Sequence, residues 1–249
     1  MSKKNFYIFA GVNGVGKSSL YKLTSTFDKN SDFGERINTD EIVNKIGNWK
    51  NAADQIKASK MAIKMRKDFI KKGISFNQET TLTGNTILKA IEEAKKNGYK
   101  ILMAYVGVEN PEIAKERVKI RVNKGGHDIP VETIERRYYE SLKNLKKIAM
   151  YCDKLVVYDN SKVGKAHTRC FIQENDSITL LAKELPKWAN DLKINLEDQL
   201  EKKSLKEIKD QEILLKQPFE EISKEDPWKR KLENDKVKGL SLGKWKQED

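Results

Sequence analysis

Short apolar segments alternate with helical patterns along the first 194 residues of the chain. The apolar segments have the length of buried strands and lie at 5–10, 36–38, 74–78, 100–106, 154–158 and 168–173. Apolar residues at helical spacing predict helices at 17–27, 52–72, 85–97, 111–123, 131–151 and 177–188. Strands that alternate with helices are typical of a parallel sheet covered by helices on both faces. The pattern therefore predicts an α/β fold.

The character of the sequence changes after residue 194. Of the 55 residues at 195–249, 13 are basic and 14 are acidic. A thin stripe of leucine and isoleucine predicts a charged helix over 195–217, and little periodicity follows Pro218. So few apolar residues do not suffice for a second core. We expect a compact domain at 1–194 and a charged helical extension with a tail at 195–249. The extension is either a solvated tail or an arm that docks on a partner.

The charge of the chain narrows the classes of partner. The net charge is +12. Residues 195–249 are nearly neutral, and residues 1–194 hold the remaining 36 basic and 23 acidic residues, so the excess positive charge lies in the first part of the chain. A basic domain favours an anionic partner such as a nucleotide, a nucleic acid or a membrane surface. No apolar run approaches the roughly 18 residues of a membrane helix, and the N-terminal run is too short for a signal peptide. We therefore expect a cytoplasmic protein without membrane contact, with Cys152 and Cys170 as thiols.

One glycine-rich segment carries a specific chemistry. Residues 11–18, GVNGVGKS, match the pattern G-x-x-x-x-G-K-[ST] in full, between a predicted strand and a predicted helix. Glycines let backbone N–H groups turn inward around phosphate oxygens, and the helix N-terminus adds partial positive charge. Lys17 is expected to reach the β and γ phosphates of ATP or GTP, and the Ser18 hydroxyl to ligate Mg²⁺. The predicted nucleotide-binding residues are Gly11, Asn13, Gly14, Val15, Gly16, Lys17, Ser18 and Ser19.

Polar residues follow the second and third predicted strands, and ligands bind at the carboxyl ends of parallel strands. Asp40 has two interpretations: an N-cap of the next helix, or the base that takes a proton from an acceptor hydroxyl. Glu79 either binds substrate hydroxyls, holds a Mg²⁺-bound water or caps a turn. Thr80 and Thr81 beside it add hydroxyl groups that suit a turn or a sugar ligand.

A candidate lid lies between the predicted helices 111–123 and 131–151. Arg117 and Arg121 are four residues apart and share one helix face, and a Gly-Gly pair follows them. Arginine suits a phosphate lid because its planar fork binds phosphate oxygens in pairs. The second helix carries Arg136 and Arg137, for which a surface ion pair is an equally good interpretation.

Taken in order, these residues resemble the zeta toxin family of P-loop kinases, in the branch often labelled predicted ABC-type ATPase, over about residues 5–185. The matching segments are 11–18, Asn38-Thr39-Asp40, 79–84, Arg117-x-x-x-Arg121 with 125–130, Arg137-Tyr138-x-x-Ser141-x-x-Asn144-Leu145 and 157–161. The resemblance implies a P-loop kinase-like fold in which Asp40 is the base and Glu79 the third-strand glutamate. The lid arginines then fall on Arg117 and Arg121. Thr83 and Asn85 stand where members of the family carry an arginine.

The resemblance also implies an activity. Members use ATP, or GTP, and Mg²⁺ to phosphorylate a hydroxyl of UDP-N-acetylglucosamine, and Glu79, Thr80 and Thr81 then bind this substrate. Such kinases act as toxins that a small antitoxin protein neutralises.

Two other classes compete with this interpretation. A P-loop ATPase without a small-molecule acceptor needs an apolar strand that ends in an acidic residue, and 74–79 matches that poorly. A nucleic-acid kinase is permitted by the charge. It is not expected, because no RNA-binding motif and no basic stripe interleaved with aromatic residues is present.

Overall fold

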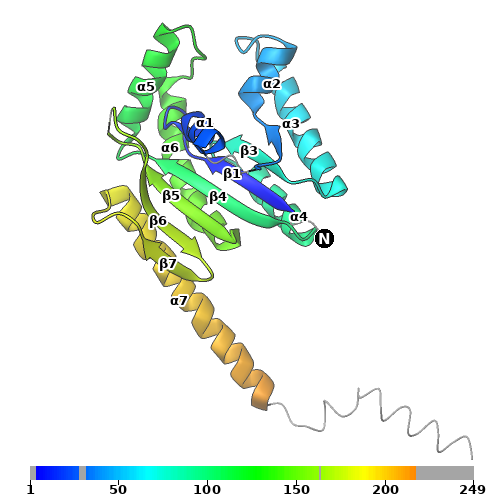
Figure 1. Cartoon of the computed structure of the whole chain (residues 1–249), viewed down its shortest axis with the longest axis vertical. Helices are drawn as coiled ribbons and strands as arrows, with labels where there is room; N and C mark the ends of the chain where they lie inside the picture. Colours follow the sequence, from blue (N-terminus) through cyan, green and yellow to red (C-terminus); the bar gives the residue numbers. More distant parts are fainter. Residues whose placement is uncertain (1–3, 28–31, 163, 217–249) are drawn as a thin grey trace, which may run out of the picture. The chain divides into compact units, whose positions relative to one another are not determined.

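A computed structural model describes residues 4–27, 32–162 and 164–216 of the chain. Seven strands form one sheet in the order β2-β3-β1-β4-β5-β6-β7 (Figure 1). The five parallel strands are β1 (Asn5–Ala10), β2 (Glu35–Ile37), β3 (Phe76–Thr80), β4 (Lys100–Gly107) and β5 (Lys154–Asp159). Two antiparallel strands, β6 (Thr168–Glu174) and β7 (Ser177–Leu180), complete the sheet. The predicted α/β fold with a mostly parallel sheet is confirmed.

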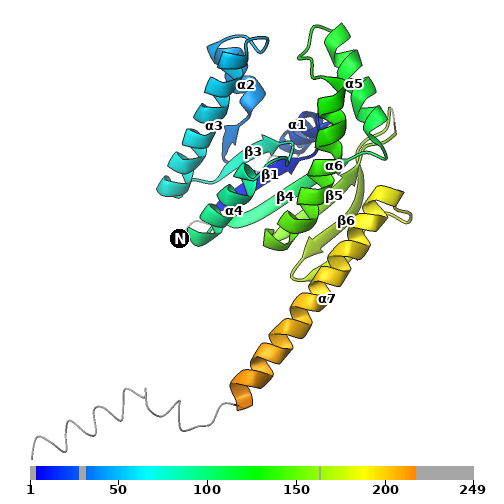
Figure 2. The same ribbon diagram turned by 180° about the vertical axis from the view of Figure 1, so that it is seen from behind.

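Helices cover both faces of this sheet. The described residues form the helices α1 (Lys17–Phe27), α2 (Thr39–Ile46), α3 (Ala52–Lys72), α4 (Thr86–Lys96), α5 (Pro111–Asn123), α6 (Val131–Ile148) and α7 (Lys187–Lys216), with a 3₁₀ turn at Ala149–Tyr151. Helix α1 lies against one face, and Figure 2 shows α4 and α6 against the other. Neighbouring β1 residues Ile8 and Phe9 accordingly join two different buried clusters.

Part of the predicted helix at 177–188 is wrong. Residues 177–180 form β7, which pairs with β6 in a hairpin. The two residues between the strands, Asn175 and Asp176, have φ of 52° and 57°. A tight hairpin turn of the primed type needs positive φ at both central residues, and Asn and Asp tolerate it better than most residues. The Asn-Asp pair was the local signal for a hairpin.

The sequence pattern also missed α2, a helix of eight residues. Its N-cap is Asn38, whose side-chain oxygen accepts hydrogen bonds from the backbone N–H groups of Asp40 and Glu41. The N-cap interpretation of Asp40 is therefore wrong, because the preceding asparagine already satisfies these donors. Asp40 lies in the first turn of α2 and its side chain is 63% exposed.

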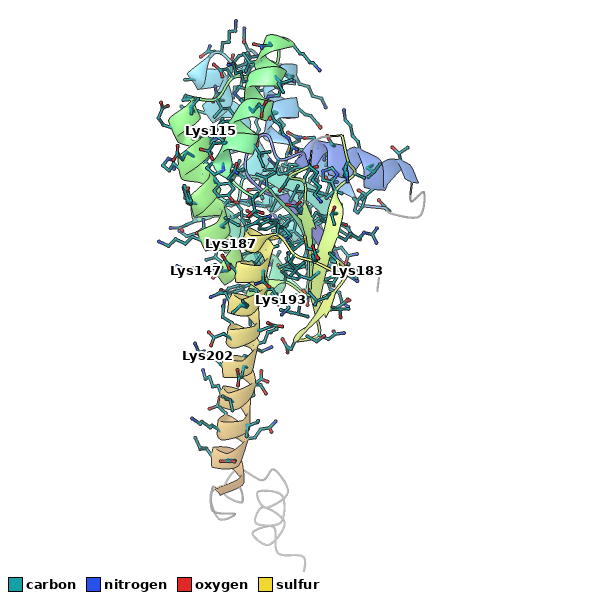
Figure 3. The ribbon with its side chains drawn as sticks, turned by 90° about the vertical axis from the view of Figure 1, so that its left-hand side faces the viewer. Lys115, Lys147, Lys183, Lys187, Lys193 and Lys202 are labelled. Atoms are coloured by element: carbon teal, nitrogen blue, oxygen red, sulfur yellow. The ribbon has the colours of Figure 1, made fainter. Side chains whose placement is uncertain are left out.

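Helix α7 continues through the boundary expected at 194/195. Leu192, Leu196 and Leu200 on its first part are buried, and the chain divides into two compact units after Leu200. The expected boundary itself stays a prediction. Figure 3 labels Lys187, Lys193 and Lys202 along this helix. Among the residues that the structure describes, none of the helices combines the length and the apolar character that a membrane span requires.

Candidate active site

The predicted phosphate loop, residues 11–18, lies where the sequence places it, between the end of β1 and the start of α1. Gly11, Gly14 and Gly16 have φ of 137°, 85° and 96°, in the region that favours glycine. A Cβ atom at Gly11 would collide with the backbone oxygen of Val106 on β4. The Gly11 N–H donates to the Thr80 oxygen at 3.2 Å, so the loop is also tied to the end of β3.

The Lys17 side chain folds back over this loop. Its Nζ donates to the Val12 backbone oxygen at 3.1 Å. Burial lowers the pKa of Lys17 from 10.5 to about 8, although the carboxylates of Glu79 and Asp40 act in the opposite direction. An ammonium that is only partly accessible to solvent and has one backbone partner is poorly solvated. A phosphate group arriving at the loop would therefore meet a cation that gains much from pairing with it.

Glu79 lies directly beside the P-loop serine. It occupies the end of β3, next to Phe9 of β1 in the parallel register. The Ser18 hydroxyl donates to Glu79 Oε2 at 2.8 Å, and the Glu79 side chain is 8% exposed. The described residues contain no group of three or more His, Cys, Asp or Glu side chains that could hold a metal ion. Mg²⁺ does not need one, because it binds through one or two protein oxygens together with phosphates and water. The Ser18–Glu79 pair fits that requirement.

The two threonines after Glu79 shape the turn that ends β3. The Thr80 hydroxyl accepts from the Leu82 N–H at 3.0 Å, and the Thr81 and Thr83 hydroxyls are 2.8 Å apart. Leu82 is fully buried with a φ of 60°, an unusual conformation for a leucine. The hydroxyls predicted to meet substrate thus also hold this turn in shape.

Asp40 lies in the first turn of α2, close enough to Lys17 for its carboxylate to act on the charge of that lysine. Helices α2 and α5 lie at the same end of the sheet (Figure 1). Asp40 Oδ1 lies 3.9 Å from Nδ1 of His127, which belongs to the loop between α5 and α6. The His127 ring also packs on Trp49 with ring centroids 4.7 Å apart. Burial lowers the pKa of His127, so its ring is mostly neutral at pH 7. The loop between α5 and α6, which is the tip of the predicted lid, therefore contacts the connection between α2 and α3 beside Asp40.

The predicted lid arginines come from α5 and are only partly satisfied. Arg121 Nη2 donates to the His127 backbone oxygen at 2.6 Å, while its Nε is buried and has no partner within the described ranges. Arg117 Nη1 is likewise buried and unpaired among the described residues, and burial lowers the pKa of Arg117. Buried unpaired donors are costly. Both arginines thus keep a donor group that an anionic ligand would satisfy, and their role as lid arginines stays a prediction.

The two arginines of α6 have different surroundings. Arg137 Nη1 donates to Asn13 Oδ1 of the phosphate loop at 2.9 Å, so Arg137 is part of the site. Arg136 instead forms an exposed pair with Glu140 at 3.0 Å, which is the surface interpretation. The sequence left both alternatives open because the helix face depends on how α6 packs.

Two residues that follow β5 in the chain also contact the phosphate loop. Asn160 Nδ2, just after β5, donates to the Val15 oxygen at 2.8 Å. His167 Nε2 lies 3.2 Å from the Gly16 oxygen. The Asn160 contact agrees with the segment 157–161 of the resemblance, whereas nothing in the sequence pointed to His167 or Trp49.

Comparisons with known proteins agree with this geometry. A family model described as Zeta toxin matches residues 1–175. An uncharacterized protein of Haemophilus influenzae is 34% identical over 131 residues, which cover 52% of this chain and 89% of the relative.

Solved structures share the fold at low identity. A chain from the PezAT chromosomal toxin-antitoxin system of Streptococcus pneumoniae matches with a TM-score of 0.53 and 14% identity, over 81% of this chain and 88% of the other. A chain from the AvrRxo1-ORF1:AvrRxo1-ORF2 complex with ATP matches with a TM-score of 0.55 and 12% identity, over 80% of this chain and 76% of the other. Because the family match covers well over half of its residues, the chain belongs to the zeta toxin family and is a zeta-toxin-like P-loop kinase.

Proposed function

We propose that this kinase transfers the γ-phosphate of ATP, or of GTP, to a hydroxyl group of a nucleotide sugar, with UDP-N-acetylglucosamine as the first candidate. The observation that carries the proposal is the position of Asp40. Its carboxylate has no capping role, stays exposed, and lies within the electrostatic reach of Lys17 and beside the lid tip. A carboxylate at this place suits a general base for an acceptor alcohol.

Each charged group has a distinct role in this proposal. Lys17 and the N–H groups of the loop hold the β and γ phosphates, and Arg117, Arg121 and Arg137 meet them from the lid side. Mg²⁺, held through Ser18 and a water on Glu79, would neutralise charge on the phosphates. Asp40 orients the acceptor hydroxyl and takes its proton.

The acceptor would bind along the turn after β3. Thr80 and Thr81 place hydroxyl groups there next to Glu79, and sugars are recognised by such groups. The assignment of UDP-N-acetylglucosamine rests on membership of the family.

A hydrolytic P-loop ATPase is the second candidate, and one observation favours it. The Ser18–Glu79 contact resembles the pairing of a metal-binding serine with a strand-end carboxylate, which an ATPase also uses. The two functions differ in the fate of the phosphate, since an ATPase releases it to water without any acceptor.

The direct test incubates the full chain with γ-³²P-ATP, Mg²⁺ and UDP-N-acetylglucosamine, and in parallel with a bacterial metabolite extract. We expect label in a nucleotide-sugar product that is absent when Lys17→Ala replaces the wild type. Label only in inorganic phosphate, at the same rate with and without acceptor, would support the ATPase instead.

We further propose that the chain works with an antitoxin protein, because the PezAT structure that it resembles comes from a toxin–antitoxin system. Induced expression should then slow bacterial growth, and Lys17→Ala should relieve the inhibition at equal protein level. Growth inhibition that persists in Lys17→Ala would separate toxicity from phosphoryl transfer.

A further inference from the structure

Arg36 of β2 makes four contacts on the side of the sheet that faces α1. Its Nη2 forms an ion pair with Glu79, and its Nη1 donates to Asn77 Oδ1 at 3.1 Å. Its Nε donates to Glu41 Oε1 at 2.9 Å. The guanidinium carbon lies 3.7 Å from the centre of the Tyr21 ring. One side chain thus joins β3, α2 and α1.

Two of these contacts lead directly into the active site. Glu79 uses one carboxylate oxygen for Arg36 and the other for the Ser18 hydroxyl, so Arg36 orients the carboxylate toward the P-loop serine. Glu41 follows Asp40 in the first turn of α2, so the same guanidinium also anchors the turn that carries the proposed base. Arg36 itself contacts none of the residues assigned to phosphate.

The geometry requires an arginine. Three separate nitrogens serve three acceptors while the flat face of the group stacks on Tyr21, and a lysine ammonium cannot reproduce that fork. Burial alone would lower the pKa of Arg36, but hydrogen bonds and charges from Glu79 and Glu41 outweigh it and raise the pKa. The guanidinium is therefore a permanent cation between two carboxylates.

Asn77 of β3 helps to hold the Arg36 side chain in place. It is fully buried, and its Nδ2 lies 3.3 Å from the oxygens of Phe33 and Gly34, just before β2. Its amide is therefore oriented with Oδ1 toward Arg36. The Asn77 amide also lies 3.4 Å from the Glu35 backbone oxygen, so several contacts hold the side chain that supports Arg36.

We propose that Arg36 is a positioning residue that holds Glu79 at the Mg²⁺ side of the phosphate loop and thereby sets how much Mg²⁺ strengthens nucleotide binding. The inference rests on the proposed function only through the role of Mg²⁺ at Ser18 and Glu79, and it does not depend on the acceptor. Loss of the Arg36 fork leaves Glu79 free to turn away from Ser18, and the loop then keeps its own contacts to the phosphates.

The test measures ADP binding by titration calorimetry, with Mg²⁺ and with EDTA, for the wild type, Arg36→Lys, Glu79→Gln and the double variant. Arg36→Lys keeps the charge and removes the fork. We expect its affinity for metal-free ADP to stay within about twofold of the wild type. The factor by which Mg²⁺ increases ADP affinity should fall roughly tenfold, as for a lost charged hydrogen bond. The effect of Mg²⁺ on ADP affinity should be no smaller in the double variant than in Glu79→Gln alone, because both changes remove the same Arg36–Glu79 pair.

The matched control is Arg136→Lys, the same substitution in the exposed pair with Glu140. It should leave the Mg²⁺ gain unchanged. Thermal unfolding of every variant separates folding from positioning. The inference is overturned if Arg36→Lys lowers only the unfolding temperature, or if the losses of the two single variants multiply in the double variant. A wild type that binds ADP without any gain from Mg²⁺ would also overturn it, while nucleotide binding by the kinase would stand.

Discussion

Replacement of the P-loop lysine should make the nucleotide-free protein more stable. Burial lowers the pKa of Lys17 from 10.5 to about 8, so folding places an ammonium where it is poorly solvated. That difference corresponds to about 3 kcal/mol at ~1.4 kcal/mol per tenfold change in proton affinity. Because the side chain remains partly accessible to solvent, we expect Lys17→Met to raise the free energy of unfolding by about 1–3 kcal/mol at pH 7.

The stability difference between the wild type and Lys17→Met should depend on pH in one direction. Between pH 8 and 10.5 the unfolded chain holds the Lys17 proton more tightly than the folded chain does. The wild type therefore gains stability as the pH rises through this window, whereas Lys17→Met lacks the group. The advantage of the variant should be full below pH 8 and shrink to roughly half near pH 9.5.

The assay is urea unfolding at pH 7 and pH 9.5, followed by tryptophan fluorescence in phosphate-free buffer, because phosphate would bind the loop. Lys57→Met on the exposed side of α3 serves as the control for a lost surface charge. A Lys17→Met variant less stable than the wild type at pH 7, or an advantage that does not change with pH, would refute the reasoning. The same variant should have no detectable phosphoryl transfer.

Three further changes test the site and its support. Asp40→Asn should cut turnover by roughly 10²–10⁴ with near-normal ATP binding, because it removes the proposed base. Its unfolding temperature should not change, because Asn38 caps α2, and a fall in stability without a fall in turnover would contradict the role of Asp40 as base. Arg121→Ala should lower turnover far more than ATP affinity, and equal small losses in both would indicate a structural contact only. A chain ending at residue 200 should still fold and bind ATP. A chain ending at 193 lacks the buried Leu196 and Leu200, and its free energy of unfolding should fall by about 2–5 kcal/mol. Thermal melts followed by circular dichroism compare the two chains, and equal stability would refute the role of α7.

The phosphate loop is the part of the site that the sequence determines almost alone. The strand, loop and helix around Lys17 are adjacent in the chain, and the glycine conformations at Gly11, Gly14 and Gly16 are local properties of the backbone. The alternation of strands and helices likewise predicts the α/β class, because each period reports the burial of one element. The helix expected over 177–188 was wrong at its start because a strand of four residues is too short to show its own period. The Asn175–Asp176 pair was the only local signal for the hairpin there.

The surroundings of the loop depend on the order of the strands in space. Arg36 and Glu79 are 43 residues apart in the chain, and they meet because β2 and β3 are neighbours in the sheet. Ser18 reaches Glu79 because β3 also pairs with β1, and Asn160 reaches the loop from the end of β5. No periodicity encodes such pairings, since they follow from the packing of whole elements. The sequence by itself therefore determined the fold class and the chemistry of the phosphate loop. The tertiary structure alone decided how Arg36, Glu79 and Ser18 meet beside it, because strand order brings them together.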